Sequence, residues 1–350
     1  MRLLVTGGCG FIGSNFVRHV LQARSEWDVV VYDLLTYSGN LGNVADLVPC
    51  PRFRFVKGDI ADSNGVANAA AGVDTIVNFA AESHVDRSIL EATPFVHTNI
   101  LGTQVLLEAA RTLHVGRFVQ ISTDEVYGSL GPTGRFREDR ALAPNSPYSA
   151  SKAAADLLVR AYVQTHAVPA IVLRSSNAYG PYQFPEKLIP LVIANASHGK
   201  PLPVYGDGLH VRDWVHVFDL CEAILHVLER GRTGEVYNVG GGNERTNLDV
   251  VYAIAELTGT SKSLIRFVQD RPGHDRRYAM GFTKLKAELG WRPRRVFEDG
   301  LRETVEWYTR QRAWVDSVAN GEYRSYYEQQ YGARLASATL TPQRSLATAT

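Results

Sequence analysis

The sequence predicts an α/β protein with a doubly wound parallel sheet and a smaller, mixed α/β C-terminal lobe. Over the first 175 residues, short β-branched runs alternate with segments of helical periodicity, which is typical of βαβ units. After residue 180, Pro and Gly become more frequent, so this second part cannot bury a large core alone. We expect a domain over residues 1–175, to which the chain later returns, a lobe over 176–330 and a mobile tail over 331–350.

The individual elements follow from their periodicity. The runs predicted as strands are residues 2–6, 28–33, 53–57, 75–79, 118–122 and 170–174. They indicate a seven-stranded sheet that is nearly complete by residue 175. Helical spacing of apolar residues, as at Val96, Ile100 and Val105, marks the helices. These are predicted over residues 11–24, 93–114, 147–164, 188–198, 217–230 and 247–257.

The composition excludes several classes of protein. The 350 residues include 37 Lys plus Arg and 36 Asp plus Glu, a formal net charge of +1, which argues against a nucleic-acid partner held by a basic surface. Three widely spaced cysteines support neither a disulfide framework nor a metal site, so the compartment should be reducing. Because apolar runs are short and signal-peptide features are missing, we expect a cytoplasmic protein with no membrane partner.

A glycine-rich turn follows the first predicted strand. Gly7, Gly10 and Gly13 are spaced three apart where the next helix begins. Glycines there let the backbone approach a pyrophosphate, whose charge the helix N-terminus meets, although a tight βα turn alone would also explain them. Asp33 lies twenty residues after Gly13, where a carboxylate accepts hydrogen bonds from an adenosine ribose and repels a 2′-phosphate. The pattern therefore predicts NAD rather than NADP, unless Asp33 is only a turn residue.

Further cofactor contacts are expected after the third and fourth strands. Asp59 follows the third strand, where it would meet the adenine amino group or, alternatively, cap a helix. The residues expected to bind the cofactor are Gly7, Gly10, Phe11, Ile12, Gly13, Asp33, Asp59, Ile60, Ala80, Tyr148 and Lys152.

Two groups of residues are candidates for catalysis. Tyr148 and Lys152 share one face of a predicted helix, so the ammonium would stabilise a phenolate and make the tyrosine a usable base; an exposed helical pair is the alternative. Thr123, Asp124 and Glu125 follow a core strand, whose C-terminal end faces the ligand crevice in such sheets. Two adjacent carboxyls suit removal of a proton from one carbon and protonation of a hydroxyl leaving the next, although the triplet would also cap a helix.

These motifs resemble the extended short-chain dehydrogenases/reductases that act on nucleotide sugars. The resemblance rests on GGCGFIG, on Tyr148 with Lys152, and on STDEVYG after the fifth predicted strand. Over roughly residues 1–330, segments typical of the 4,6-dehydratases of this family follow in order: DLLTYSGN, AAESHVDRSI, RSSNAYGPYQFPEKLIPL, VYGDGLHVRDW and RPGHDRRYA. Epimerases and decarboxylases of the family usually lack the Thr-Asp-Glu triplet. The resemblance implies a Rossmann-type sheet, NAD as cofactor and dTDP-glucose as substrate.

The resemblance also implies a role for each catalytic candidate. Tyr148, assisted by Lys152, removes the C4 hydroxyl proton as hydride passes from C4 to NAD, and Thr123 hydrogen-bonds that hydroxyl. Glu125 then removes the C5 proton while Asp124 protonates the departing C6 hydroxyl. Hydride return to C6 gives dTDP-4-keto-6-deoxy-glucose and water. The competing interpretations are another NAD-dependent sugar-nucleotide epimerase or decarboxylase, and a catalytically silent NAD-binding protein.

Substrate contacts are expected mainly in the second lobe. Arg212 and Arg271 are candidates for the diphosphate because a guanidinium binds phosphate through two parallel hydrogen bonds, and the family pattern adds three more polar residues. His84 would contact a ligand or, equally, pack in the core. The resemblance further implies a homodimer joined through the helices at 93–114 and 147–164. The expected substrate set is Ser83, His84, Thr123, Asn177, Lys187, Arg212, Asn247 and Arg271.

Overall fold

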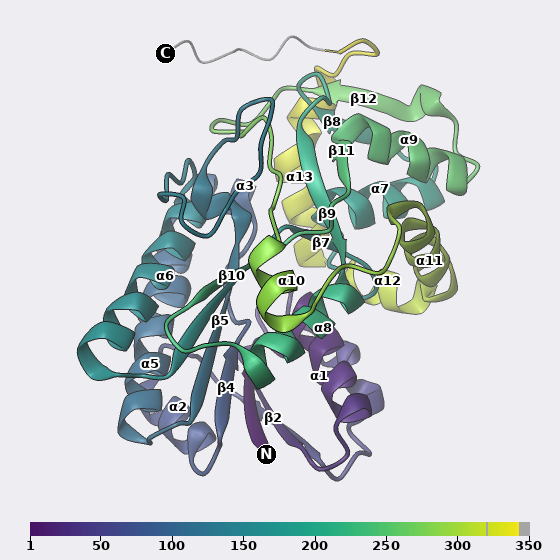
Figure 1. Ribbon diagram of the computed structural model, residues 1–350. Helices are drawn as coiled ribbons and strands as arrows, with labels where there is room; N and C mark the ends of the chain where they lie inside the picture. Colours follow the sequence, from purple (N-terminus) through teal and green to yellow (C-terminus); the bar gives the residue numbers. More distant parts are fainter. Residues whose placement is uncertain (320, 343–350) are drawn as a thin grey trace.

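The structure is a computed structural model that describes residues 1–319 and 321–342. One lobe surrounds a large parallel sheet, and a second lobe of short strands and helices lies above it in the view of Figure 1. The predicted α/β fold class is confirmed. None of the helices in the described residues is long and apolar enough to cross a bilayer.

The large sheet is entirely parallel. Within the described residues its seven strands are ordered β10-β6-β5-β4-β1-β2-β3. The order reverses between β1 and β4, and the C-terminal ends of strands at such a point form the crevice where open α/β sheets bind ligands. The strands are β1 (Arg2–Thr6), β2 (Asp28–Asp33), β3 (Phe53–Lys57), β4 (Thr75–Asn78), β5 (Arg117–Thr123), β6 (Ala170–Ser175) and β10 (Val236–Val239).

Strand β10 was not predicted. The other six strands match the predicted runs to within one residue at each end. In β10, Val236 pairs with Val172 and Val239 with Ser175, so the sheet is completed by the second half of the chain and not by residue 175. Four residues between two glycine-containing segments carry too little periodicity to be recognised as a strand.

Helices cover both faces of the sheet. On one face α1 packs against α8, and on the other α5 packs between α2 and α6 (Figure 1). Phe16 and Leu220 are fully buried on the first face, and Ile76 and Leu106 on the second. The two apolar layers explain why the strands have apolar residues on both faces. These helices are α1 (Phe11–Ala23), α2 (Ser63–Ala70), α5 (Thr103–Thr112), α6 (Pro147–His166) and α8 (Val217–Arg230).

The helix predicted to begin at residue 93 contains a π-helical stretch. It starts as α4 (Thr93–Phe95), widens over η3 (Val96–Gly102) and continues as α5. The buried Asn99 accepts a hydrogen bond from the Glu82 amide and donates to the Glu82 carbonyl, both at 2.9 Å. It also donates to the Ser151 hydroxyl of α6 at 2.8 Å. The widened turn thus attaches the loop after β4 to α6.

The second lobe packs around its own small core, in which Trp214, Val250 and Phe267 are buried. Within the described residues, its strands form the sheets β11-β9-β7 and β12-β8. The chain also returns to the first lobe, because α10 contacts β10. The elements are β7 (Asn177–Tyr179), α7 (Leu188–Ser197), β8 (Leu202–Tyr205), β9 (Val211–His216), β11 (Glu244–Thr246), α9 (Asn247–Leu257), β12 (Ile265–Val268), α10 (Thr283–Leu289), α11 (Phe297–Arg310) and α12 (Arg312–Val318).

The chain after residue 331 is not the mobile tail that was expected. Helix α13 (Gly321–Ala336) continues through these residues, Tyr331 is buried, and Thr339 exchanges two backbone hydrogen bonds with Phe267. The Tyr326 hydroxyl bonds to His84 of the first lobe at 3.1 Å. The buried face of α13 consists of Tyr323, Tyr326, Gln330 and Tyr331 among the described side chains, which a search for aliphatic periodicity overlooks. Residues 343–350 of the expected tail lie outside the described residues.

Candidate active site

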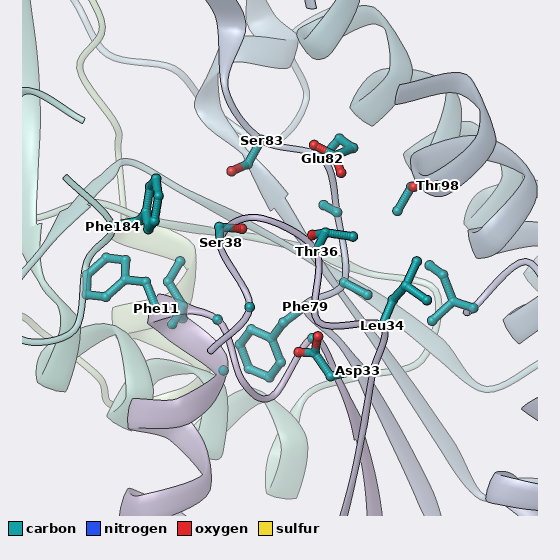
Figure 2. A pocket seen from close by; sticks show the side chains of 18 of the residues that line it. Phe11, Asp33, Leu34, Thr36, Ser38, Phe79, Glu82, Ser83, Thr98 and Phe184 are labelled. Atoms are coloured by element: carbon teal, nitrogen blue, oxygen red, sulfur yellow. The ribbon is translucent and has the colours of Figure 1, made fainter. Parts of the chain in front are cut away.

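Two adjoining cavities open at the C-terminal ends of the large sheet's strands. The first cavity lies over β1, β2 and β4 (Figure 2). The second lies between β5, α6 and the second lobe. Phe11, Ser83, Glu186 and Lys187 are among the residues that line both. A ligand in the first cavity would therefore lie next to a ligand in the second.

The glycine turn between β1 and α1 forms one wall of the first cavity. Gly7 has φ +67°, and a Cβ there would lie 2.5 Å from the Ala80 nitrogen. A Cβ on Gly13 would lie 2.3 Å from the Gly7 carbonyl oxygen. Gly10 is the residue before the first turn of α1 and also lines the cavity. Side chains are therefore excluded from this turn by steric contact, and the helix N-terminus faces the space beside it.

Asp33 closes the end of β2 beside this cavity. It is buried, and its carboxylate accepts hydrogen bonds from the Cys9 amide at 2.9 Å and the Leu35 amide at 2.8 Å. Burial raises the pKa of Asp33, and these two bonds act against that rise. Figure 2 shows Asp33 below the loop that carries Thr36 and Ser38. The turn-residue interpretation is thus correct in part, because Asp33 bonds two backbone amides and also lines the cavity.

Asp59 does not cap the helix that follows it. The cap of α2 is Asp62, whose side chain accepts from the Asn64 amide at 3.0 Å. Asp59 instead accepts from the Ala61 amide at 2.8 Å and bonds to His97 at 3.2 Å. Asp59 lines the first cavity. All the other residues predicted to bind the cofactor, except Tyr148 and Lys152, line it too.

Thr123, Asp124 and Glu125 line the second cavity together with Tyr148. Thr123 ends β5, and its hydroxyl accepts from the Glu125 amide and bonds to Asp124 Oδ1, both at 3.2 Å. Thr123 therefore does cap the short helix η4 (Asp124–Tyr127). The capping interpretation is correct, and the same hydroxyl also contacts the Asp124 carboxyl within the cavity.

The carboxyl groups of Asp124 and Glu125 are both affected by burial, but the charges around them differ. The pKa of Asp124 is raised well above its ordinary value by burial and by the neighbouring Glu125 carboxylate. Asp124 Oδ2 is buried without a hydrogen-bond partner among the described residues. Burial also raises the pKa of Glu125, but Arg271, Lys187 and Arg212 oppose that rise. Asp124 is thus the better candidate for an acid, and Glu125 is the better candidate for a base.

Tyr148 and Lys152 are both buried on one face of α6, not exposed on its surface. Ser146 and Ser149 form the capping box that begins this helix. Burial and the Glu125 carboxylate raise the pKa of Tyr148, and the expected help of Lys152 to the phenol stays a prediction. A hydrogen bond with Thr123 opposes the rise. Lys152 Nζ donates to the Ile121 carbonyl at 2.7 Å.

All the predicted substrate residues line the second cavity. Arg212 is buried, and its guanidinium donates to the carbonyls of Val211 and Asp275 and lies 4.3 Å from the Tyr278 ring. Arg271 Nε and Asn177 Oδ1 are buried without hydrogen-bond partners among the described residues. Arg271 lies 3.7 Å from Asp86, its ion-pair partner. The Arg271 Nε, a buried donor without a partner, is a favourable site for an anionic ligand, whereas Asn177 Oδ1 can only accept a hydrogen bond from a ligand.

His84 and Lys187, which line the second cavity, both hydrogen-bond to other residues of the protein. His84 Nε2 bonds to the Glu186 carbonyl and Nδ1 to the Tyr326 hydroxyl, both at 3.1 Å. Burial lowers the pKa of His84, so the ring is neutral and donates through Nε2. Lys187 Nζ donates to the Ser83 carbonyl at 2.6 Å. The packed interpretation of His84 therefore accounts for both of its nitrogens.

The chain is similar in sequence and in fold to known proteins. A family model described as GDP-mannose 4,6 dehydratase matches residues 4–304. A dTDP-glucose 4,6-dehydratase from Streptomyces niveus is 54% identical over 322 residues, which cover 91% of this chain and 96% of the relative. The chain belongs to the nucleotide-sugar 4,6-dehydratase family. The crystal structure of the dTDP-glucose 4,6-dehydratase from Streptomyces venezuelae, which contains NAD, has a TM-score of 0.89 and 50% identity, covering 91% of this chain and 100% of that one.

Epimerases share the fold of these 4,6-dehydratases at lower identity. The UDP-glucuronic acid 4-epimerase from Bacillus cereus, solved with UDP-glucuronic acid and NAD, has a TM-score of 0.83 and 29% identity, covering 89% of this chain and 99% of that one. The fold is therefore common to both activities, and the residues of the site must distinguish them.

Sequence reasoning missed a group of side chains between the two cavities of this 4,6-dehydratase family member. Glu186 lines both cavities, accepts from the Tyr37 hydroxyl at 3.0 Å and pairs with Arg87 at 3.1 Å. The Arg87 guanidinium lies 3.7 Å from the Tyr37 ring and 3.9 Å from the Tyr326 ring. These residues come from four distant segments, and no local pattern marks them as partners.

One cluster among the described residues brings potential metal ligands together: His210, Asp270 and His274. The two imidazole rings are stacked 3.7 Å apart; His274 Nδ1 bonds to Asp270 Oδ1 at 2.6 Å, and His210 Nε2 lies 3.4 Å from Asp270 Oδ2. Asp270 also accepts from the Arg271 amide at 2.9 Å. Nitrogens in two stacked planes do not converge on one ion, so we interpret the cluster as a hydrogen-bonded support for Arg271.

Proposed function

We propose that the chain catalyses the NAD-dependent conversion of dTDP-glucose to dTDP-4-keto-6-deoxy-glucose and water, as a carbon-oxygen lyase. The observation that carries the proposal is the meeting of Asp124, Glu125 and Tyr148 in one cavity beside the glycine turn. An epimerase needs a base and a hydride acceptor, but it has no need of a second, protonated carboxyl. The high identity to dTDP-glucose 4,6-dehydratases supports the same choice.

The first cavity fits a dinucleotide. The turn of Gly7, Gly10 and Gly13 leaves backbone at the N-terminus of α1 open to a pyrophosphate, and Asp33 and Asp59 would bind the ribose and the adenine amino group. NAD, when bound, accepts hydride from C4 of the sugar and returns it to C6.

The chain's own residues would supply the proton transfers. Tyr148 takes the C4 hydroxyl proton while the Thr123 hydroxyl orients that group. Glu125 takes the C5 proton, because three nearby cations favour its carboxylate form. Asp124, whose pKa is raised well above its ordinary value, gives a proton to the departing C6 hydroxyl. The opposite protonation of two adjacent carboxyls is what an elimination across two carbons requires.

Binding of the nucleotide would fall to the second lobe. Arg212 and the unpaired Nε of Arg271 would meet the diphosphate, because a guanidinium binds phosphate oxygens through parallel hydrogen bonds. Asn177, Lys187 and Asn247 line the same cavity and would hold the sugar side of the substrate.

The first prediction concerns Asp33. Asp33→Ala should weaken NAD binding about 10- to 100-fold, because hydrogen bonds to a charged group contribute roughly 1.5–3 kcal/mol each, and it should relax discrimination against NADP. The matched control is Asp28→Ala, at the opposite end of the same strand β2. Both cofactors would be titrated calorimetrically into each variant. If the affinity for NAD and the discrimination against NADP were both unchanged in Asp33→Ala, the only role of Asp33 would be to bond the two backbone amides.

The second prediction tests the overall reaction. Purified protein incubated with dTDP-glucose should form the 4-keto-6-deoxy product, detected by mass spectrometry, without consuming NAD. Hydride leaves and returns within one turnover, so the cofactor acts in catalytic amount. Accumulation of NADH in proportion to the sugar consumed would overturn the proposal.

The third prediction separates the steps. Tyr148→Phe should suppress all steps, including transient NADH formation. Glu125→Gln should allow C4 oxidation but stop C5 exchange, and Asp124→Asn should slow loss of water more than C5 exchange. Loss of a general acid or base typically costs about 10² to 10⁴ in rate. Rapid-quench single turnovers in deuterated water follow NADH and C5 deuterium together, and normal C5 exchange by Glu125→Gln would refute its role.

We also propose that the chain is a cytoplasmic homodimer. Val96, Leu101 and Leu157 are 53%, 45% and 57% exposed on η3 and α6, which contact each other. Exposed apolar side chains on adjoining helices are typical of an interface. The free thiols of the three cysteines suit a reducing compartment.

The fourth prediction tests this interface. Leu157→Glu should halve the mass measured by light scattering at low micromolar concentration, because a buried charge opposes association. Val48→Glu, at a residue 67% exposed in a different part of the first lobe, is the matched control and should leave the mass unchanged. A monomeric wild-type protein, or a dimer unaffected by Leu157→Glu, would reject this interface.

A further inference from the structure

Helix α6 carries a third ionisable residue in line with its catalytic pair. Tyr148, Lys152 and Asp156 follow one another at four-residue intervals and are 8%, 4% and 3% exposed. Residues four apart lie on the same helical face. The carboxyl of Asp156 therefore lies one turn beyond Lys152, on the side away from Tyr148.

Asp156 belongs to a buried network that extends away from the cavities. Its Oδ2 accepts from Arg174 Nε at 2.8 Å, and Arg174 also donates to the Tyr127 hydroxyl at 2.8 Å. Tyr127 in turn donates to Asn238 at 2.8 Å. The ion pair is almost fully buried, with side-chain exposures of 7% for Arg174 and 2% for Asp156. A buried pair of this kind contributes little net stability compared with apolar residues of similar size, so stability alone is a weak reason for it.

Lys152 needs a counter-charge at this position. Burial lowers the pKa of Lys152 to about 8, and Asp156 is the group whose charge opposes that fall. In return, Lys152 and Arg174 oppose the rise that burial causes in the pKa of Asp156. Without the carboxylate, the folded-state pKa of Lys152 would fall further, and the side chain would lose its proton at a lower pH.

Other titratable groups lie on the elements that pack against α6. Strand β5 presents the Ile121 carbonyl to Lys152 Nζ, and Arg174 of β6 is paired with Asp156. The remaining titratable residues on α6, η4, α3 (Val85–Leu90) and η3 near this end of the helix are Tyr148, Asp124, Glu125, Tyr127, Asp86, Arg87 and His97.

We propose that Asp156 is a positioning residue of the reaction, which favours the charged form of Lys152 behind Tyr148, while the paired Arg174 favours the carboxylate form of Asp156. The proposal rests on the proposed function, because it gives Lys152 a part in C4 oxidation. Asp156 touches neither cavity; it acts only through Lys152.

The fifth prediction follows from the sign of this effect. Lys152 assists while it is protonated, so its contribution is lost as pH rises through its pKa. Asp156→Asn should move the alkaline limb of the pH profile of kcat to lower pH by about 1 unit, the size of shift that a nearby opposite charge produces. Asp156→Glu, which keeps the charge, should restore the limb toward the wild-type position.

Two variants separate this role from stability. Asp156→Asn leaves Arg174 buried and unpaired, and the protein could fail to fold; Asp156→Asn with Arg174→Met removes both charges, and the alkaline limb should still lie at lower pH. Asp219 is the matched control, because it is a buried carboxylate paired with Arg295 at 2.9 Å in another part of the chain. Asp219→Asn should lower stability and leave the limb in place.

A direct titration makes the result independent of turnover. The chain has only seven lysines, so ¹³Cε-lysine NMR can follow each of them, and Lys152→Met identifies the Lys152 signal. The proposal requires a lower titration midpoint for Lys152 in Asp156→Asn or in the double variant. An unchanged midpoint in a folded variant overturns it, whether or not the chain proves to be a dehydratase. A lowered midpoint with an unmoved alkaline limb also overturns it.

Discussion

The parallel pairing of β5 with its neighbours is the constraint on which the site depends. It places Thr123 beside Ser175 and Asn78 beside Gln120, so that the strands end along one edge. A chain of buried side-chain bonds runs beneath this edge, from Thr6 to Asn78 at 2.6 Å and from Asn78 to Gln120 at 2.9 Å. Because each polar group is satisfied by the next strand, the register cannot slip without leaving one unpaired. The glycine turn after β1 and the triplet of Thr123, Asp124 and Glu125 after β5 therefore stay at the same edge of the sheet, with β4 between them.

Burial then decides what each acid and base can do. The same loss of water that raises the pKa of Asp124 lowers that of Lys152 to about 8. Neighbouring charges modify these shifts in opposite directions: Glu125 adds to the rise at Asp124, while Arg271 and its neighbours limit the rise at Glu125. The different proton affinities of the two carboxyls are consequently a product of unequal surroundings and not of residue type.

The second lobe and α13 close this site from the other side. Arg87 of α3 (Val85–Leu90) lies between the rings of Tyr37 and Tyr326 and pairs with Glu186. Four segments thus meet at one guanidinium, which is held by its charge on one side and by aromatic faces on the others. Because Glu186 lines both cavities, this contact joins the cofactor side of the site to the substrate side.

The sequence by itself determined the six strands with their alternating helices, the glycine turn, and the Tyr148 and Lys152 pair, because each is written in neighbouring residues with a regular period. Only the tertiary structure decided that β10 completes the sheet, that α13 packs beyond residue 331, and that Asp156 pairs with Arg174 behind Lys152. It also decided that the pKa of Asp124 is raised with the help of Glu125, while three cations oppose the rise at Glu125. Such features depend on burial and on side chains distant in sequence, whose contact and loss of water exist only once the chain has folded.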